Sequence, residues 1–281
     1  MGVCLAADVY VATLRAPAGS AQSGGHLYRV DLASGKPTFI GRVLVDGTQP
    51  VGLTAMAFHP RTNVLYAVTW GINDAKRAAL LTVDHATGEA RLVARLTRPL
   101  TDISFDPEGR LYGWTADTGQ LALVDIRTAK VSTIGDMARP ATGGAFAIDS
   151  RGNGYVATWD GSATLDRVDL REGTIATGSA LHDLREVSAL RSMAFAAGGE
   201  LLATHSLRSG HAGSVLLRID PANGEAKAIG DIPEDSEAIA VAATNSAART
   251  DLMRWIAYAV IAIALLVLAL QYRRGPFRFR R

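Results

Sequence analysis

The sequence has almost none of the residues that build thiolate or redox centres. Cys4 is the single cysteine among 281 residues, which excludes an intrachain disulfide framework and a cysteine-built zinc or iron–sulfur site. Neither a G-x-S-x-G elbow nor a P-loop motif occurs, so the sequence indicates neither an α/β serine hydrolase nor a P-loop nucleotide enzyme. We expect no cofactor.

Lysine is also scarce, since the chain has 4 lysines and 25 arginines. This bias is typical of a GC-rich genome, and we expect a bacterial source. The formal net charge is +2, and the end of the chain carries five of the arginines: Arg273, Arg274, Arg278, Arg280 and Arg281. The rest of the chain is therefore slightly acidic, which argues against a nucleic-acid-binding body.

One long run without charge stands near the end of the chain. Residues 255–272 read WIAYAVIAIALLVLALQY, and as a helix they would be about 27 Å long, close to the ~30 Å core of a bilayer. A buried core helix is the alternative, but such helices rarely lack a polar face over this length. The run predicts a transmembrane helix, with Trp255 and Tyr272 at its interfaces.

The flanking charges predict an orientation for this helix. The tail at 273–281 is strongly basic, whereas the segment before the span has Arg249 and Arg254 beside Asp251. The positive-inside rule then places the tail in the cytoplasm and the body outside it. Residues 244–254 form a short tether that would keep the body close to the membrane.

Export of the body requires a signal that the first residues do not provide. The segment MGVCLAAD has no basic region and only a short apolar run, so residues 1–7 are a poor signal peptide. Either the true start lies upstream of Met1, or the protein is tail-anchored with a cytoplasmic body. We favour the exported body and retain the tail anchor as the alternative.

The remaining chain repeats a hairpin with an aspartate at its start. Four of the five copies have glycine four positions after the aspartate, as in VDLASG and IDPANG. The aspartate can cap the turn, and the glycine supplies its positive-φ residue. The copies recur at roughly the 40–50 residues of a four-stranded propeller blade. Their aspartates are Asp31, Asp84, Asp125, Asp169 and Asp220.

A strand–turn–strand segment precedes four of these hairpins and aligns in columns. One column holds Phe58, Phe105, Ile148 and Phe195, and another holds Tyr66, Tyr112, Tyr155 and Leu202. Residues 8–14 match only the second strand, and residues 238–242 match only the first. The two ends therefore complete one blade, which predicts an all-β, five-bladed β-propeller over 8–243, closed by its terminal strands.

The turn DPEGRLY, from Asp106 to Tyr112, resembles the β-propeller repeats of the NHL, YVTN and quinoprotein-like class. The resemblance covers residues 8–243 and identifies no single family. It implies that the turns joining strands one to two and three to four share one face, the short-turn face. The other loops would share the opposite, long-loop face. The class includes enzymes, binding modules and scaffolds, so it does not fix function.

The long-loop face is where we expect a site, because function concentrates on irregular loops held by a rigid scaffold. On the inner strands, Asp102 interrupts a column of small residues, and Arg191 and Glu237 stand one position earlier in other repeats. An ion pair in water at the rim is the favoured interpretation of these charges. The alternative is a polar ligand site in the central funnel, which Trp70, Trp159 and His205 would complete.

Histidine offers a weaker candidate for a metal site on the same face. His182, His205 and His211, with Asp183 nearby, have ligand chemistry suited to Zn²⁺. Their spacing matches no established pattern, and surface histidines unrelated to metal are the favoured interpretation.

The sequence favours a membrane-anchored, non-catalytic module that binds a protein partner or a small ligand on the long-loop face. An enzymatic role stays open as the alternative. A propeller hydrolase or lyase would use Asp102, Arg191, Glu237 and His205, and a carboxylate pKa shifted by burial would favour it. A purely structural subunit of an envelope complex is the third possibility.

Overall fold

The computed structural model describes most of the predicted body. The described residues are 8–16, 24–69, 78–136, 144–159, 163–182, 187–196, 198–207 and 213–242. All belong to the first of two units into which the chain divides, residues 1–243 and 244–281. Among them there is no helix of the length and apolarity that a bilayer crossing requires. The predicted leader, tether, span and basic tail lie outside the described residues.

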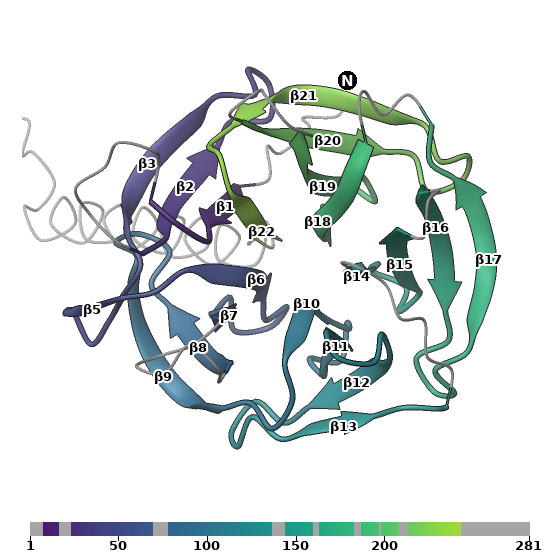
Figure 1. Ribbon diagram of the computed structural model, residues 1–281, viewed down its shortest axis with the longest axis horizontal. Helices are drawn as coiled ribbons and strands as arrows, with labels where there is room; N and C mark the ends of the chain where they lie inside the picture. Colours follow the sequence, from purple (N-terminus) through teal and green to yellow (C-terminus); the bar gives the residue numbers. More distant parts are fainter. Residues whose placement is uncertain are drawn as a thin grey trace, which may run out of the picture. The chain divides into compact units, whose positions relative to one another are not determined.

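The described strands form five antiparallel blades around a central axis, so the five-bladed β-propeller is confirmed (Figure 1). From the axis outward, blade 1 has β22 (Ser236–Val241), β1 (Val9–Thr13), β2 (His26–Val30) and β3 (Pro37–Arg42). Blade 2 has β6 (Leu53–Phe58), β7 (Leu65–Thr69), β8 (Ala79–Val83) and β9 (Glu89–Arg95). Blade 3 has β10 (Leu100–Phe105), β11 (Leu111–Thr115), β12 (Leu121–Val124) and β13 (Val131–Thr133). Blade 4 has β14 (Gly144–Ile148), β15 (Gly154–Trp159), β16 (Ala163–Val168) and β17 (Ile175–Ala180), and blade 5 has β18 (Val187–Phe195), β19 (Leu201–Leu207), β20 (Ser214–Ile219) and β21 (Ala226–Ile232).

The terminal strands close the ring as the partial repeats predicted. Strand β22 pairs antiparallel with β1, with Val241 opposite Val9. Just beyond the pair, the backbone N–H of Ala242 donates to the carbonyl of Asp8 at 2.9 Å. Blade 1 thus takes its inner strand from the end of the propeller and its other three from the beginning, which leaves no unpaired inner edge.

Blade 2 has an addition that the sequence did not predict. Between blades 1 and 2 the chain forms β4 (Leu44–Val45) and β5 (Gln49–Pro50). Strand β4 pairs in parallel with the outer edge of β9, with Leu44 opposite Glu89. A two-residue strand has too few positions to show a period of two, so sequence patterning could not reveal it.

The hairpin aspartates cap their turns as expected. In blade 4, the Asp169 carboxylate accepts hydrogen bonds from the backbone N–H groups of Arg171 and Glu172 at 2.7 and 3.0 Å. Gly173 closes that turn with a φ of 69°. In blade 3, Ala129 adopts the same left-handed conformation without glycine. Hydrogen bonds from turn N–H groups lower the pKa of three of these carboxyls, those of Asp31, Asp125 and Asp169.

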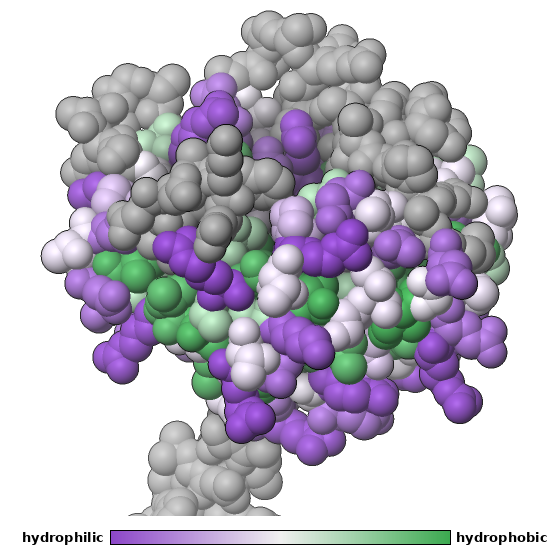
Figure 2. Space-filling view, turned by 60° about the horizontal axis from the view of Figure 1, so that its bottom comes forward, coloured by the Kyte–Doolittle hydropathy of each residue, from purple (hydrophilic) through white to green (hydrophobic). Residues whose placement is uncertain are grey.

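The aligned aromatic columns pack against each other between neighbouring blades. Tyr10 of blade 1 contacts Phe58 of blade 2, with ring centroids 5.5 Å apart. The pattern repeats at blades 2 and 3 and at blades 4 and 5, and aliphatic side chains share the buried clusters at the other two interfaces. The columns recur because each blade must present the same residues to the next. Figure 2 shows the outer surface, where hydrophobic residues lie among hydrophilic ones.

Candidate functional site

The central axis is closed by one buried residue from each inner strand. These residues are Ala55, Asp102, Ala145, Ser192 and Ala238, and the side chain of each is fully buried. We call them the axial layer. The strand registers place them at equivalent positions, opposite the second strand of each blade. The column predicted from the sequence is therefore real, and Asp102 is a carboxyl group inside it.

Asp102 accepts four hydrogen bonds, from its own strand, from the neighbouring blade 4 and from blade 5 across the axis. One oxygen accepts from the backbone N–H of Ile103 at 3.0 Å and from the Ser192 hydroxyl at 2.9 Å. The other accepts from the backbone N–H groups of Phe146 and Met193, both at 2.9 Å. The Ser192 oxygen in turn accepts from the N–H of Ile239 at 3.2 Å.

This network ties together the inner strands β10, β14, β18 and β22 at the axis. Burial raises the pKa of Asp102 to about 8, against the opposing effect of its four donors. Both oxygens are occupied by donors of the protein itself, and the side chain has no exposed surface. The arrangement suits a structural link between blades 3, 4, 5 and 1. A ligand-binding role for Asp102 stays a prediction.

A second set of equivalent residues lies directly before the axial layer in sequence, toward the long-loop face. We call Thr54, Thr101, Gly144, Arg191 and Glu237 the mouth ring. In four of the five blades the strand register shifts at this position, and the mouth residue is the extra one. Such bulges change the direction of a side chain and are frequent beside functional sites. Blade 4, with Gly144, keeps a regular register.

The two charges of the mouth ring form a partly buried ion pair. The Arg191 Nε lies 3.6 Å from a Glu237 carboxylate oxygen, with side chains 38% and 19% exposed. Burial raises the pKa of Glu237, while Arg191 opposes this shift and Asp235 adds to it. The ion pair that the sequence favoured therefore exists, but Glu237 is more buried than a residue at a solvent-exposed rim.

Thr101 joins the mouth ring of blade 3 to blade 4. Its hydroxyl donates to the Gly144 carbonyl, a member of the same ring, at 2.8 Å. Together with the ion pair, this contact gives the ring both charged and neutral polar groups above a closed axis. Such a ring can orient a polar group of a ligand or partner while the strands hold its residues in place.

The other predicted residues do not all fall within the described part of the chain. His205 is buried in β19, opposite Leu190 of the inner strand. Trp159 ends β15, but its side chain lies outside the described part. Trp70 lies outside it entirely, so the proposed aromatic stacking stays a prediction.

The metal candidate is likewise only partly described. His182 is exposed, and His205 is buried. His211 and Asp183 lie outside the described residues. Within the described ranges, no three histidine, cysteine, aspartate or glutamate side chains are grouped as a metal site would require.

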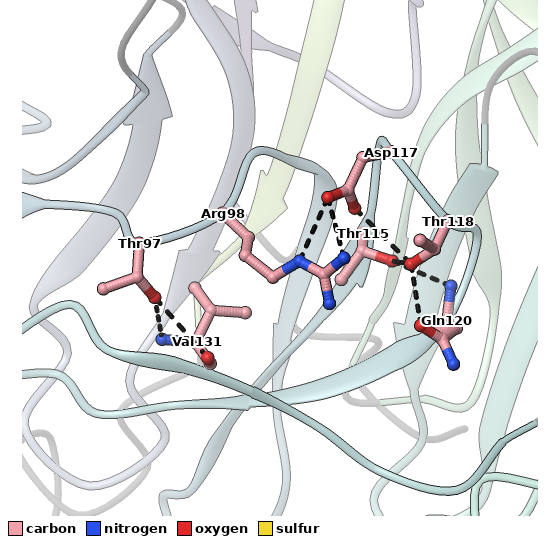
Figure 3. Close-up of polar contacts among 7 residues, drawn as sticks. All are labelled: Thr97, Arg98, Thr115, Asp117, Thr118, Gln120 and Val131. Carbon is pink, nitrogen blue, oxygen red and sulfur yellow. Dashed lines mark hydrogen bonds and ion pairs between the residues drawn. The ribbon is translucent and has the colours of Figure 1, made fainter.

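Blade 3 carries a polar cluster on the long-loop face that sequence reasoning missed (Figure 3). The Arg98 guanidinium makes two contacts with one oxygen of Asp117, at 2.9 and 3.0 Å. The Thr115 hydroxyl accepts a hydrogen bond from the N–H of Gln120 at 2.9 Å and contacts the Thr118 hydroxyl. These bonds fix a short turn between β11 and β12 beside the mouth ring. The sequence signal for this cluster is a threonine that recurs at the end of the second strand in four of the five blades, with Thr115 in blade 3.

Comparisons with known proteins support the fold. No protein-family model matches the chain, and no curated protein matches it by sequence. The solved structure of TolB from Acinetobacter baumannii has a TM-score of 0.51 and 17% identity, covering 81% of this chain and 54% of the TolB chain. A protein of unknown function from Bacteroides caccae has a TM-score of 0.50 and 9% identity, covering 84% and 99%. The chain thus spans about half the length of TolB, and at these identities the likeness concerns the fold alone.

Proposed function

We propose that this chain is a membrane-anchored β-propeller that binds a protein partner or a small ligand, without catalysis, on its long-loop face. The observation that carries the proposal is the mouth ring. Four bulged positions and one glycine surround the axis, and two of them hold a partly buried charge pair. A partly desolvated charge pair discriminates between polar groups of a partner. A group of the partner that is left there without a hydrogen bond or an opposite charge raises the free energy of the complex.

The chemistry of the mouth ring favours a partner with polar or charged groups. The Arg191 guanidinium can bind a carboxylate in a bidentate manner, and the Glu237 carboxylate can accept from an amine or amide. The axial layer below the mouth ring is fully buried, so a bound group would approach from the long-loop face and stop at the ring.

A photo-crosslinking experiment in cells tests this proposal. A benzophenone amino acid is placed at Thr54 in the mouth ring or at Leu123, which is 39% exposed on the third strand of blade 3. We expect a covalent adduct of defined mass from position 54 and none from position 123. Combining position 54 with Arg191→Ala and Glu237→Ala should reduce the adduct at least tenfold.

Identical adducts from both positions, or an adduct at position 54 that survives the double substitution, would refute the mouth ring as the binding site. The thermal midpoint of the double variant serves as the folding control. The double variant removes both partners of the ion pair, so no partly buried charge is left unpaired, and we expect its midpoint to stay close to that of the parent protein.

One observation favours an enzyme as the second candidate. Glu237 is a mouth carboxyl whose pKa is raised by burial, which is a property of many general acids. Glu237→Gln separates the two functions, because glutamine retains hydrogen bonding but cannot transfer the proton. The enzymatic function is favoured if this variant still forms the crosslinked adduct, while only the parent protein releases a chemically altered form of the bound small molecule.

The membrane anchor and the location of the body are also part of the proposal. We propose that the body lies outside the cytoplasm, with residues 273–281 inside. The basic residues at 273–281 support this orientation through the positive-inside rule.

Protease accessibility tests this orientation. In cells whose outer envelope has been opened while the inner membrane stays intact, we expect added protease to cleave the body and leave a cytoplasmic C-terminal tag in place. Digestion that requires rupture of the inner membrane would instead show a tail-anchored protein with a cytoplasmic body. A periplasmic and a cytoplasmic marker protein report which membrane is open.

A further inference from the structure

One cavity among the described residues lies away from the mouth ring. It is a groove of about 610 Å³ between blades 3 and 4, lined by the strand-one-to-two turns of both blades and by the outer half of blade 4. We call it the charged groove. Its polar lining includes four arginines: Arg110, Arg151, Arg167 and Arg171.

The repeats provide an internal comparison for this groove. At the equivalent place in blade 5, Arg218 pairs with Glu200 at 3.2 Å, so the cation there is neutralised within the blade. Arg167 occupies the position of Arg218 in blade 4, as the strand registers show. The position of Glu200 is taken by Asn153, whose amide donates to Asp149 at 2.8 Å. Blade 4 therefore has the arginine but not the carboxylate that pairs with it in blade 5.

Arg167 is instead held in place by an aromatic ring. Its guanidinium carbon lies 5.6 Å from the centroid of the Tyr155 ring. This stacking leaves the hydrogen-bonding edge of the guanidinium available and restricts the side chain before any ligand arrives. Among the described residues, no carboxylate lies within 4.0 Å of the Arg167 guanidinium.

Two further arginines of the groove lack a close carboxylate, although carboxylates are nearby. No described carboxylate lies within 4.0 Å of Arg151 or Arg171, both of which are exposed. The lining carboxylates have their own partners. Asp106 binds Arg110 at 2.6 Å, and Asp169 caps its turn. The groove thus contains three guanidinium groups with no described carboxylate within 4.0 Å, although Asp149 and Asp169 attract Arg151 and Arg171 over longer distances.

We propose that the charged groove binds an acidic segment of a protein partner, with Arg151, Arg167 and Arg171 contacting its carboxylates. Arginine forms bidentate, charge-assisted bonds with carboxylates. Three cations distributed over a groove of this volume fit an extended ligand with several charges better than one small anion. The floor contributes apolar surface from Val168, Leu170 and Ile175. The proposal concerns the short-turn face and is independent of the mouth ring.

Binding of a fluorescent hexaglutamate peptide to the full-length chain tests this inference. Fluorescence anisotropy is measured at low ionic strength in a non-ionic detergent. The test variant is Arg151→Gln with Arg167→Gln, and the matched control is Arg218→Gln, the equivalent arginine that is paired in blade 5. We expect the test variant to weaken binding at least tenfold and the control to change it less than twofold.

Equal weakening by test and control variants, or no weakening by either, overturns the proposal. Inorganic phosphate and vesicles containing phosphatidylglycerol are measured in parallel. Binding of phosphate as strong as that of the peptide would mean a small-anion site. Stronger binding of the vesicles, lost in the test variant, would mean a lipid headgroup site. Should the double glutamine variant unfold, Arg151→Lys with Arg167→Lys keeps the charge, and we expect it to bind more weakly than the parent because lysine lacks the bidentate fork.

Discussion

Replacing Asp102 with alanine is expected to lower the thermal midpoint by about 10 °C or more, or to prevent folding. The change leaves three backbone N–H groups and the Ser192 hydroxyl without their acceptor at the buried axis. Each unsatisfied buried donor costs about 1–3 kcal/mol, against a total stability of roughly 5–15 kcal/mol. The measurement is thermal unfolding followed by near-ultraviolet circular dichroism.

The matched control is Asp125→Ala, which removes another aspartate that accepts backbone hydrogen bonds. Asp125 bonds the N–H groups of Arg127 and Thr128 in an exposed turn, where water can replace the lost acceptor. We expect the thermal midpoint to fall much less than in Asp102→Ala. If the two variants have the same midpoint, Asp102 is not the link between blades that the hydrogen bonds indicate.

The raised pKa of Asp102 also predicts how stability changes with pH. With a pKa of about 8 in the folded protein and about 3.9 unfolded, the folded state retains a proton that the unfolded chain releases. The resulting stabilisation is complete below about pH 4 and is lost as pH rises through 8, with a slope on the order of 1 kcal/mol per pH unit.

Urea midpoints between pH 5 and 8 measure this slope. Asp102→Asn, which cannot titrate, should be less stable than the parent and should show a flatter pH profile. A parent profile that is flat over this range would mean that the four donors keep Asp102 ionised in the folded protein.

Removing β22 is expected to abolish cooperative folding of the propeller. Ile239 is fully buried in the cluster shared by blades 5 and 1, and Ala238 and Ala240 are buried against blade 2. Without the strand, the inner edge of β1 is unpaired and Ser192 loses the N–H of Ile239. A chain ending after Asp235 should therefore have no sharp thermal transition.

The control is a chain ending after Ala243, which retains β22 and should keep a sharp transition. Addition of a synthetic peptide of residues 236–243 to the shorter chain should restore part of the protease resistance, because the peptide can pair with β1. A sharp transition in the shorter chain alone would show that the terminal closure is dispensable.

The architecture could be read from the sequence because its signals are local and repeated. The capping aspartates and the Phe and Tyr columns depend on a few neighbouring residues and recur in blade after blade. The closure was predictable for a related reason: residues 8–14 and 238–242 each match one strand of the repeat and lack the other. A pattern that occurs five times leaves little freedom in assigning strands.

The environment of Asp102 was not predictable, although the sequence shows that Asp102 is an exception in the column of small residues on the inner strands. One of its carboxylate oxygens accepts hydrogen bonds from the backbone N–H groups of Phe146 and Met193. Nearly every residue has such a group, so the residue types do not indicate these bonds. Nothing in the residue types distinguished a ligand-facing carboxylate from one enclosed by four inner strands. The bulges of the mouth ring escaped notice for the same reason, because register is a property of paired strands.

The charged groove was missed because its arginines look like ordinary surface residues when each is considered alone. The informative signal was a difference between repeats. Asn153 stands where blade 5 has Glu200. Comparing charge partners from one repeat to another, rather than hydrophobic columns alone, would have identified blade 4 as unusual.

The parallel pairing of β4 with β9 has a consequence for self-association. The outer strand of a propeller blade presents unpaired backbone groups, and two copies of a protein can join by pairing such edges. In blade 2, Leu44 and Val45 pair in parallel with Glu89 and Ala90 and so occupy the beginning of that edge. The outer strands of the other blades, β3, β13, β17 and β21, end their sheets among the described residues. A second copy can therefore pair with β9 only beyond Ala90, and the parallel bridge between His182 and Glu225 restricts the start of the outer edge of blade 5 in the same way.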